Sequence, residues 1–234
     1  MLPAAADRVQ EAMRYAVLGP GQRLRPMLAL RVARVLGGPE NRTRIAGAAI
    51  ELLHCASLIV DDLPCMDNDG TRRNRPALHV EFGEATAILA AFALVALAAR
   101  VVAAFPAFQI KLLNTLDCSQ LIQGQSLDLE LTGSARNAQR PLVTELKTVP
   151  LFDLAIHAGL LSSRAGRDHA QAVLSFGHEF GSAYQILDDF TDGEITNSAP
   201  VNEQFSRARA CLKVFGSEAY PLEELLDQLN GKIL

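Results

Sequence analysis

The chain of 234 residues is 49% hydrophobic, so it has enough apolar material for a sizeable core and is not disordered as a whole. Its formal net charge of −4 and isoelectric point near 5.7 argue against a broad nucleic-acid-binding surface, because such a surface needs clustered Lys and Arg. Ala and Leu dominate, aromatic residues make up 6% and Trp is absent, which favours helices over sheets.

The predicted helices are read from apolar residues at helical spacing, interrupted by Gly- and Pro-rich segments. Asn41 is a candidate N-cap for the third helix, and Pro64 disfavours helical geometry at Leu63, where we expect that helix to end. The predicted helices cover residues 7–18, 23–36, 41–63, 82–104, 108–131, 141–163, 167–190, 201–215 and 221–231. No long period-two alternation and no linker interrupts the pattern, so the sequence predicts one all-α domain over residues 1–234.

The cysteines and the N-terminal residues bear on the cellular compartment. Cys55, Cys65, Cys118 and Cys211 show neither the C-x-x-C spacing of a zinc site nor the density of a secreted disulfide scaffold. Residues 1–20 lack the basic start and apolar core of a signal peptide. We expect reduced thiols in a cytoplasmic protein; a plastid is the alternative if the source is a plant and a transit peptide is absent from this sequence.

The stretch ATAILAAFALVALAARVVAAF, residues 85–105, is membrane-like and has a single charge, at Arg100. Alanine contributes little to insertion, and an Arg near the middle of a span costs about 2.5–3.5 kcal/mol on insertion scales. We therefore expect no transmembrane span here but a helix buried on all sides in a large bundle.

The segment SLIVDDLPCMDNDGTRRNRP, residues 57–76, places Asp61, Asp62 and Asp67 around the end of the third predicted helix. On a continuous helix these acids would fan around the axis, since Asp67 falls about 240° from Asp61. Pro64 ends the helix, so the next residues can fold back and bring Asp67 to the same cation as Asp61.

Two arginines follow in the same loop. Arg72 and Arg73 beside a carboxylate-held Mg²⁺ suit a diphosphate, because metal ions bridge some of its oxygens while guanidinium groups bind others. The plain alternative is a solvated loop in which Asp and Arg simply pair.

A second acidic cluster lies in YQILDDFTD, residues 184–192. Asp188 and Asp192 are one helical turn apart on the same face, so both can ligate one hard cation. Without a cation, two acids at this spacing repel one another, and packing gives no reason to place them on a mostly apolar helix. Two such clusters, each at the end of an apolar helix, favour metal binding over chance.

These segments resemble the trans-isoprenyl diphosphate synthases, specifically the short-chain farnesyl/geranylgeranyl diphosphate synthase group, from about Met13 to Asp192. The matching segments, in the family order, are GQRLRP (21–26), ELLHCASLIVDDLPCMD (51–67), RR (72–73), HVEFGEATAILA (79–90), GQSLDL (124–129), KT (147–148) and YQILDDFTD (184–192). The resemblance implies the isoprenoid synthase fold: a single helical bundle around a deep central cavity, with the two acidic motifs facing each other across its mouth.

The resemblance also implies a magnesium-dependent head-to-tail condensation of isopentenyl diphosphate with an allylic prenyl diphosphate, in a homodimer. The implied Mg²⁺ ligands are Asp61, Asp62, Asp67, Asp188, Asp189 and Asp192. The implied contacts of the allylic diphosphate are Arg72, Lys147 and Gln185, and those of isopentenyl diphosphate are Arg25, His54 and Arg73. Thr148 matches a residue that shields the developing carbocation. Asp61, Asp62, Arg72, Lys147 and Asp188 are the expected catalytic residues.

This chemistry requires no enzyme nucleophile, because Mg²⁺ and Arg stabilise the charge that forms on the departing diphosphate. In this family the diphosphate is the usual proton acceptor. His54 lies two helical turns before Asp61 and hence on nearly the same face. A buried structural histidine is the alternative, but the motif favours a functional one.

Product length in this family is usually limited by bulk at the fourth and fifth residues before the first aspartate. Ser57 and Ala56 occupy those positions and are small, so we expect geranylgeranyl diphosphate rather than farnesyl diphosphate. Phe92 is a candidate floor of the tunnel, with core packing as the alternative.

Several positions depart from the family pattern. Gln22 replaces a lysine expected for isopentenyl diphosphate, Ala91 and Phe92 stand where Gly-Asp is common, and residues 193–204 contain no Lys or Arg. These departures leave open a non-catalytic subunit of a prenyl synthase. A terpene cyclase is a third interpretation, but it has no need for the residues that suit a second diphosphate substrate.

Overall fold

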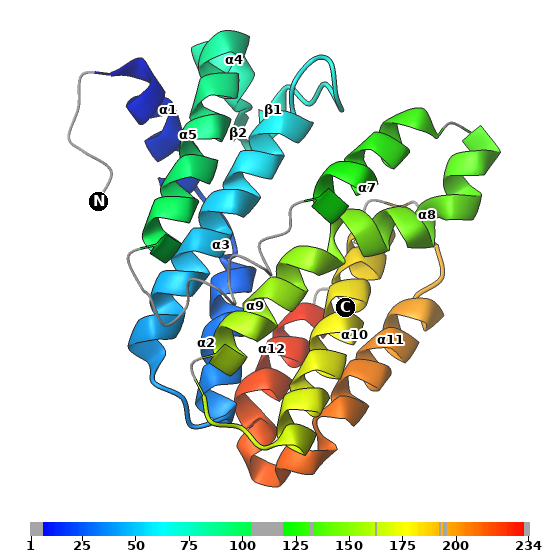
Figure 1. Cartoon of the computed structure of the whole chain (residues 1–234). Helices are drawn as coiled ribbons and strands as arrows, with labels where there is room; N and C mark the ends of the chain where they lie inside the picture. Colours follow the sequence, from blue (N-terminus) through cyan, green and yellow to red (C-terminus); the bar gives the residue numbers. More distant parts are fainter. Residues whose placement is uncertain are drawn as a thin grey trace. The chain divides into compact units, whose positions relative to one another are not determined.

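The computed structural model describes residues 7–103, 119–131, 133–161, 163–191, 193 and 196–231, with the backbone alone at 133–137 and 144. The regular structure of these residues is helical apart from one short hairpin (Figure 1). The chain divides into two compact units, Met1–Leu24 with Ala48–Gln109 (unit 1) and Arg25–Gly47 with Ile110–Leu234 (unit 2).

Unit 1 contains α1 (Arg8–Leu18), most of α3 (Glu40–Asp61), α4 (Leu78–Phe82) and α5 (Glu84–Ala103). Asp7 caps α1, since its carboxylate accepts the Val9 N–H at 2.9 Å. The helices α1, α4 and α5 pack on one another, and the ring of Tyr15 meets Phe82 edge-on at 5.4 Å between centroids. The Tyr15 hydroxyl donates to the Pro76 carbonyl at 3.0 Å, which ties α1 to the hairpin.

The hairpin consists of β1 (Thr71–Arg72) and β2 (Arg75–Pro76), antiparallel with Arg72 opposite Arg75. The two residues between the strands, Arg73 and Asn74, have φ angles of 55° and 60°. Two central residues with positive φ define a type I′ turn, whose twist matches that of the strands. The hairpin therefore holds Arg72 and Arg73 in fixed and different directions.

Unit 2 holds α2 (Leu24–Val35, apart from its first residue), α7 (Ser119–Glu130), α8 (Gly133–Lys147), α9 (Val149–Leu161), α10 (Arg167–Thr191), α11 (Ala199–Cys211), the 3₁₀ helix η1 (Lys213–Ala219) and α12 (Tyr220–Asn230). The helix α10 lies between α9 and α11 (Figure 1). The core of unit 2 contains Phe152, Phe176 and Phe180, all fully buried. The ring centroid of Phe180 lies 5.4 Å from that of Phe152 and 5.5 Å from that of Phe176. This packing places the C-terminal end of α10 beside α8.

Several predicted helices are confirmed to within one or two residues, among them 7–18, 23–36 and 167–190. The third helix begins at Glu40 and ends at Asp61, so Asn41 is not its N-cap and Pro64 lies three residues beyond its end. The prediction for 108–131 is confirmed over 119–130, and its earlier part lies outside the described residues.

The predicted single helix over 141–163 is wrong. The helix is interrupted at Thr148, which lies between α8 and α9. The helix α8 begins upstream of residue 141 and contains Pro141. Pro150 favours the start of a new helix at this point, because proline has no N–H and is tolerated best in the first turn of a helix. The short helix α4 was also missed; Gly83 ends it with a φ of 86°, a conformation that favours glycine.

The prediction that the helix over 85–105 is buried on all sides is wrong within this chain. One face of α5, with Ala87, Ala90 and Leu94, is buried, whereas Leu89 and Phe92 are 56% and 71% exposed. By length and composition α3 and α5 could each cross a membrane, with 61% and 33% of their most apolar windows buried. This is weak evidence, because core helices of water-soluble proteins pass the same test.

Candidate functional site

In unit 1 the first aspartate-rich segment turns back on the end of α3. The Asp67 N–H donates to the Asp61 carbonyl at 2.9 Å, and the Asn68 N–H donates to the Leu63 carbonyl at 3.1 Å. Asn68 has a φ of 55°, a conformation that Asn tolerates better than most residues. The predicted fold-back after the helix is thus present, with Asp61 half-buried and Asp67 exposed.

Asp62 points inward and holds Arg72. The Asp62 carboxylate is buried, and its Oδ1 accepts from Nε of Arg72 at 2.8 Å and also from Nη2. Arg72 Nη2 donates in addition to Asp69 Oδ2 at 2.8 Å. Burial raises the pKa of Asp62, and the Arg72 guanidinium opposes that rise. This ion pair holds the Arg72 side chain in place, so in this structure the Asp62 carboxylate orients an arginine.

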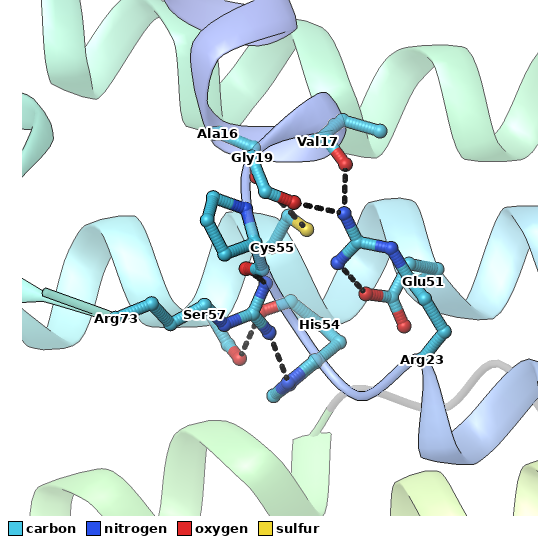
Figure 2. A network of polar contacts seen from close by, with 10 residues as sticks. Ala16, Val17, Gly19, Arg23, Glu51, His54, Cys55, Ser57 and Arg73 are labelled. Atoms are coloured by element: carbon cyan, nitrogen blue, oxygen red, sulfur yellow. Dashed lines mark hydrogen bonds and ion pairs between the residues drawn. The ribbon is translucent and has the colours of Figure 1, made fainter. Parts of the chain in front are cut away.

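The structure brings together Arg73 and His54, two of the three residues predicted to hold isopentenyl diphosphate (Figure 2). Arg73 Nη1 donates to the Pro20 carbonyl at 3.0 Å, and Nη2 lies 3.5 Å from His54 Nε2. The third residue, Arg25, belongs to unit 2. It is 8% exposed, and its guanidinium carbon lies 4.5 Å from the centre of the Phe152 ring, a cation–π contact.

A small pocket of about 50 Å³ lies in unit 1. Its walls include the apolar Leu58 and Ile59 together with Arg72, Arg73 and Arg75. The guanidinium carbon of Arg75 lies 3.7 Å from the ring centre of Tyr15, which also lines the pocket. Three arginines thus line this pocket, and one of them, Arg72, is paired there with the Asp62 carboxylate, which also lines the pocket.

Unit 2 contains Lys147 and Gln185, two of the three residues predicted to contact the allylic diphosphate, and Thr148, the residue predicted to shield the carbocation. Thr148 Oγ1 donates to Gln185 Oε1 at 2.8 Å, and Gln185 Nε2 donates to Asp189 Oδ1 at 2.9 Å. Lys147 Nζ lies 3.2 Å from Asp128 Oδ2 on α7. The break between α8 and α9 is what turns Thr148 toward α10, while Lys147 remains the last residue of α8.

The aspartates of the second aspartate-rich motif differ in their exposure to solvent. Asp188 is exposed, whereas Asp189 is 6% exposed and lies with its Oδ2 3.6 Å from Arg140 Nε on α8. Asp189, like Asp62, therefore faces inward to a guanidinium. Asp192 lies outside the described residues, so its predicted pairing with Asp188 stays a prediction.

The donor chemistry is compatible with magnesium, because the carboxylates of Asp61, Asp67 and Asp188 are hard oxygen ligands of the kind that this ion prefers. Among the described residues, no three His, Cys, Asp or Glu side chains gather closely enough to hold a metal ion by themselves. The metal role of these aspartates stays a prediction.

Ala56 is buried and Ser57 half-buried on α3, where the Ser57 hydroxyl donates to the His54 carbonyl at 3.0 Å. Phe92 is 71% exposed, so the alternative that it packs in the core of this chain is wrong. Its role as a tunnel floor, and the deep central cavity itself, stay predictions.

Sequence reasoning did not single out four residues that the structure places beside the predicted ones: Asp128, Arg140, Arg23 and Glu51. Asp128 lies in the GQSLDL segment, so its position in a matched motif was the available signal. Arg140 gave no signal, because its contact with α10 depends on how α8 packs.

The chain matches known proteins over most of its length. The family model described as polyprenyl synthetase matches residues 6–200. A geranylgeranyl diphosphate synthase of Pantoea ananas is 35% identical over 241 residues, covering 97% of this chain and 79% of that protein. Geranylgeranyl pyrophosphate synthase 10, mitochondrial, of Arabidopsis thaliana is 34% identical over 227 residues; the chain is covered to 92% and spans 64% of that relative's length.

Solved structures show the same fold. An apo FPP/GFPP synthase from Zymomonas mobilis superimposes with a TM-score of 0.87 at 32% identity, covering 96% of this chain and 90% of that one. A geranyltransferase from Legionella pneumophila gives 0.86 at 30% identity, covering 99% and 90%. The all-α fold is that of the isoprenoid synthases, as predicted. The chain belongs to the polyprenyl synthetase family.

Proposed function

We propose that the chain is a prenyltransferase that condenses isopentenyl diphosphate head-to-tail with an allylic prenyl diphosphate and releases geranylgeranyl diphosphate. The contacts of two neighbouring residues in unit 2 carry the proposal: Thr148 is hydrogen-bonded through Gln185 to Asp189, and Lys147 forms an ion pair with Asp128. These residues come from two motifs far apart in the sequence, and together they offer a cation, an amide and a hydroxyl to one diphosphate-bearing substrate.

In the proposed reaction, the bond between the allylic C1 and its diphosphate oxygen breaks, and the double bond of isopentenyl diphosphate attacks C1. A proton then leaves to form the new double bond, with the departing diphosphate as acceptor. Arg72 and Lys147 bind negative charge as it develops on that leaving group. Thr148 donates its hydroxyl hydrogen to Gln185, so the lone pairs of its oxygen stay available to the positive charge on the prenyl chain.

We propose that the reaction depends on Mg²⁺, with Asp61 and Asp67 as the candidate ligands in unit 1 and Asp188 as a candidate ligand in unit 2. When bound, the ion supplies Lewis-acid stabilisation of the diphosphate leaving group. Asp62 and Asp189 instead orient Arg72 and Arg140, which fits their burial and guanidinium contacts.

Purified protein with Mg²⁺, isopentenyl diphosphate and farnesyl diphosphate should yield geranylgeranyl diphosphate on chromatography, and chelation by EDTA should abolish the product. Farnesyl diphosphate as the end product from a shorter starter would support the alternative chain length. A cyclic hydrocarbon from a single prenyl diphosphate would contradict the proposal in favour of a cyclase. Absence of product from this chain alone, with a changed rate on adding a second synthase, would favour the non-catalytic subunit.

We also propose a homodimer that covers the exposed apolar face of α5, formed by Ile88, Leu89, Phe92 and Val95. These side chains are 40%, 56%, 71% and 45% exposed, and an apolar stripe of this kind marks an interaction site. Sedimentation of Phe92→Glu should show a monomer. The matched control Val214→Glu, at a residue that is 50% exposed in η1, should leave the assembly unchanged.

A further inference from the structure

Arg23 joins α1, the segment that follows it, and α3 within unit 1. Its Nη2 donates to the carbonyls of Val17 at 2.5 Å and Gly19 at 2.6 Å, and its Nη1 donates to Glu51 Oε1 at 2.8 Å (Figure 2). Glu51 is 5% exposed. One guanidinium thus satisfies two carbonyls at the end of α1 and a buried carboxylate one turn before His54.

The backbone at Arg23 is strained. Its φ of 50° lies in the left-handed region that a residue with a long side chain rarely adopts. A strained conformation persists only where surrounding contacts hold it. The three hydrogen bonds of the Arg23 side chain supply such contacts, so this side chain and its ion pair with Glu51 fix the course of residues 17–23.

That course positions Arg73. The Pro20 carbonyl, in the middle of the fixed segment, accepts from Arg73 Nη1 at 3.0 Å while Nη2 of Arg73 lies beside His54. A Cβ on Gly21 would lie 2.4 Å from Arg73 Nη1 and 2.7 Å from Arg23 Nη1. The two guanidinium groups therefore rest against the bare Cα of Gly21, and any side chain there displaces them.

We propose that Arg23 and Glu51, with Gly21 as the contact surface, are positioning residues that aim the Arg73 guanidinium beside His54 at the diphosphate of isopentenyl diphosphate. The inference rests on the proposed function and adds residues to it. Gln22 is uncharged where the family resemblance leads one to expect a lysine, so the orientation of Arg73 carries more of the binding in unit 1. Arg73 keeps further N–H donors for phosphate oxygens, because a guanidinium has five.

The test compares how the variants change KM for isopentenyl diphosphate and KM for the allylic substrate. Arg23→Asn combined with Glu51→Gln removes the ion pair without leaving a buried lone carboxylate, and Asn tolerates the left-handed backbone. Loss of one well-aimed charged hydrogen bond corresponds to about a tenfold rise in KM. We expect that rise for isopentenyl diphosphate, with KM for the allylic substrate and kcat changed less than about twofold on the same scale.

Gly21→Ala gives an independent test, because the three atoms nearest to its Cβ are side-chain atoms of Arg73 and Arg23. It should raise KM for isopentenyl diphosphate without raising KM for the allylic substrate, and it should lower the melting temperature only slightly, since both side chains can shift. Gly166→Ala, where a Cβ meets nothing within 4 Å, is the matched control and should change neither KM nor the melting temperature. An unchanged KM for isopentenyl diphosphate in both arms, or equal losses for both substrates together with a lower melting temperature, would overturn the inference.

Calorimetric titration with isopentenyl diphosphate alone separates this inference from the proposed function. If the natural chain binds isopentenyl diphosphate but makes no product, the proposed function fails, and the same variants decide the inference through Kd. If the natural chain does not bind isopentenyl diphosphate at all, the inference is refuted as well.

Discussion

Replacing Gly124 by Ala tests the close contact between α7 and α8. A Cβ at Gly124 would lie 2.6 Å from the backbone nitrogen of Lys147 and 2.8 Å from the carbonyl carbon of Leu146. Backbone atoms cannot rotate away as a side chain can, so the two helices have to separate. Reaching an ordinary contact of 3.4 Å requires a shift of about 0.8 Å between them.

The expected free-energy change follows from two opposing effects. Ala gains up to about 1 kcal/mol over Gly in a helix interior, whereas overpacking costs about 1–3 kcal/mol. The variant should therefore lose up to about 2 kcal/mol of unfolding free energy, which lowers the melting temperature by several degrees. A 0.8 Å shift also lengthens the 3.2 Å contact between Lys147 Nζ and Asp128 Oδ2 toward the limit of an ion pair. The same shift moves Lys147 away from the position in which we propose that it binds the allylic diphosphate.

Thermal unfolding and steady-state kinetics check both effects. We expect KM for the allylic substrate to rise by about tenfold, the equivalent of one weakened charged hydrogen bond. Gly166→Ala serves as the control, since it makes the same chemical change in open space. An equal or higher melting temperature together with an unchanged KM would show that α7 and α8 do not pack as closely as described.

Three further variants test other parts of the chain. Arg72→Ala leaves the Asp62 carboxylate buried without its guanidinium, and denaturant titration should show that the free energy of unfolding falls by about 1–3 kcal/mol. Adding Asp62→Asn should restore the stability but not prenyl transfer. A double variant as unstable as the single one would contradict the ion pair as the cause. Burial raises the pKa of Asp153 above its ordinary 3.8, so the charged form of this side chain opposes folding. The protonated side chain therefore makes its full contribution to stability below pH 3.8, and this contribution is lost as the pH rises through the pKa of the folded state. Asp153→Asn should therefore raise the melting temperature at pH 7 and by progressively less toward pH 3.8, and an equal gain at both ends would contradict this. Ala56→Tyr should shorten the prenyl product on chromatography, and an unchanged length would mean that the growing chain takes another route.

The helices were largely predictable because the apolar periodicity and the Gly and Pro interruptions are local. The residues 167–190, for example, were predicted one residue short of α10. The break at Thr148 was missed because the apolar pattern continues through it, although Pro150 was a signal. The hairpin was missed because its strands have two residues each, too few for a period-two pattern to appear.

The burial of α5 could not be predicted because its composition is apolar on all sides. Periodicity identifies the buried face only where polar residues occupy the other face, and α5 offers too few of them. Which of its apolar residues contact α1 and α4, and which stay exposed as Phe92 does, depends on the packing of unit 1.

The sequence by itself determined the family and the positions of the charged residues, because motif identity and spacing are properties of the chain alone. The tertiary structure decided the direction of each charge. Neighbouring aspartates such as Asp61 and Asp62 look alike in sequence, yet one is half-buried at the helix end and the other is buried against Arg72. The reason is that a buried carboxylate is stable only with a partner, and the partners of Asp62, Asp189 and Glu51 come from segments that only folding brings near.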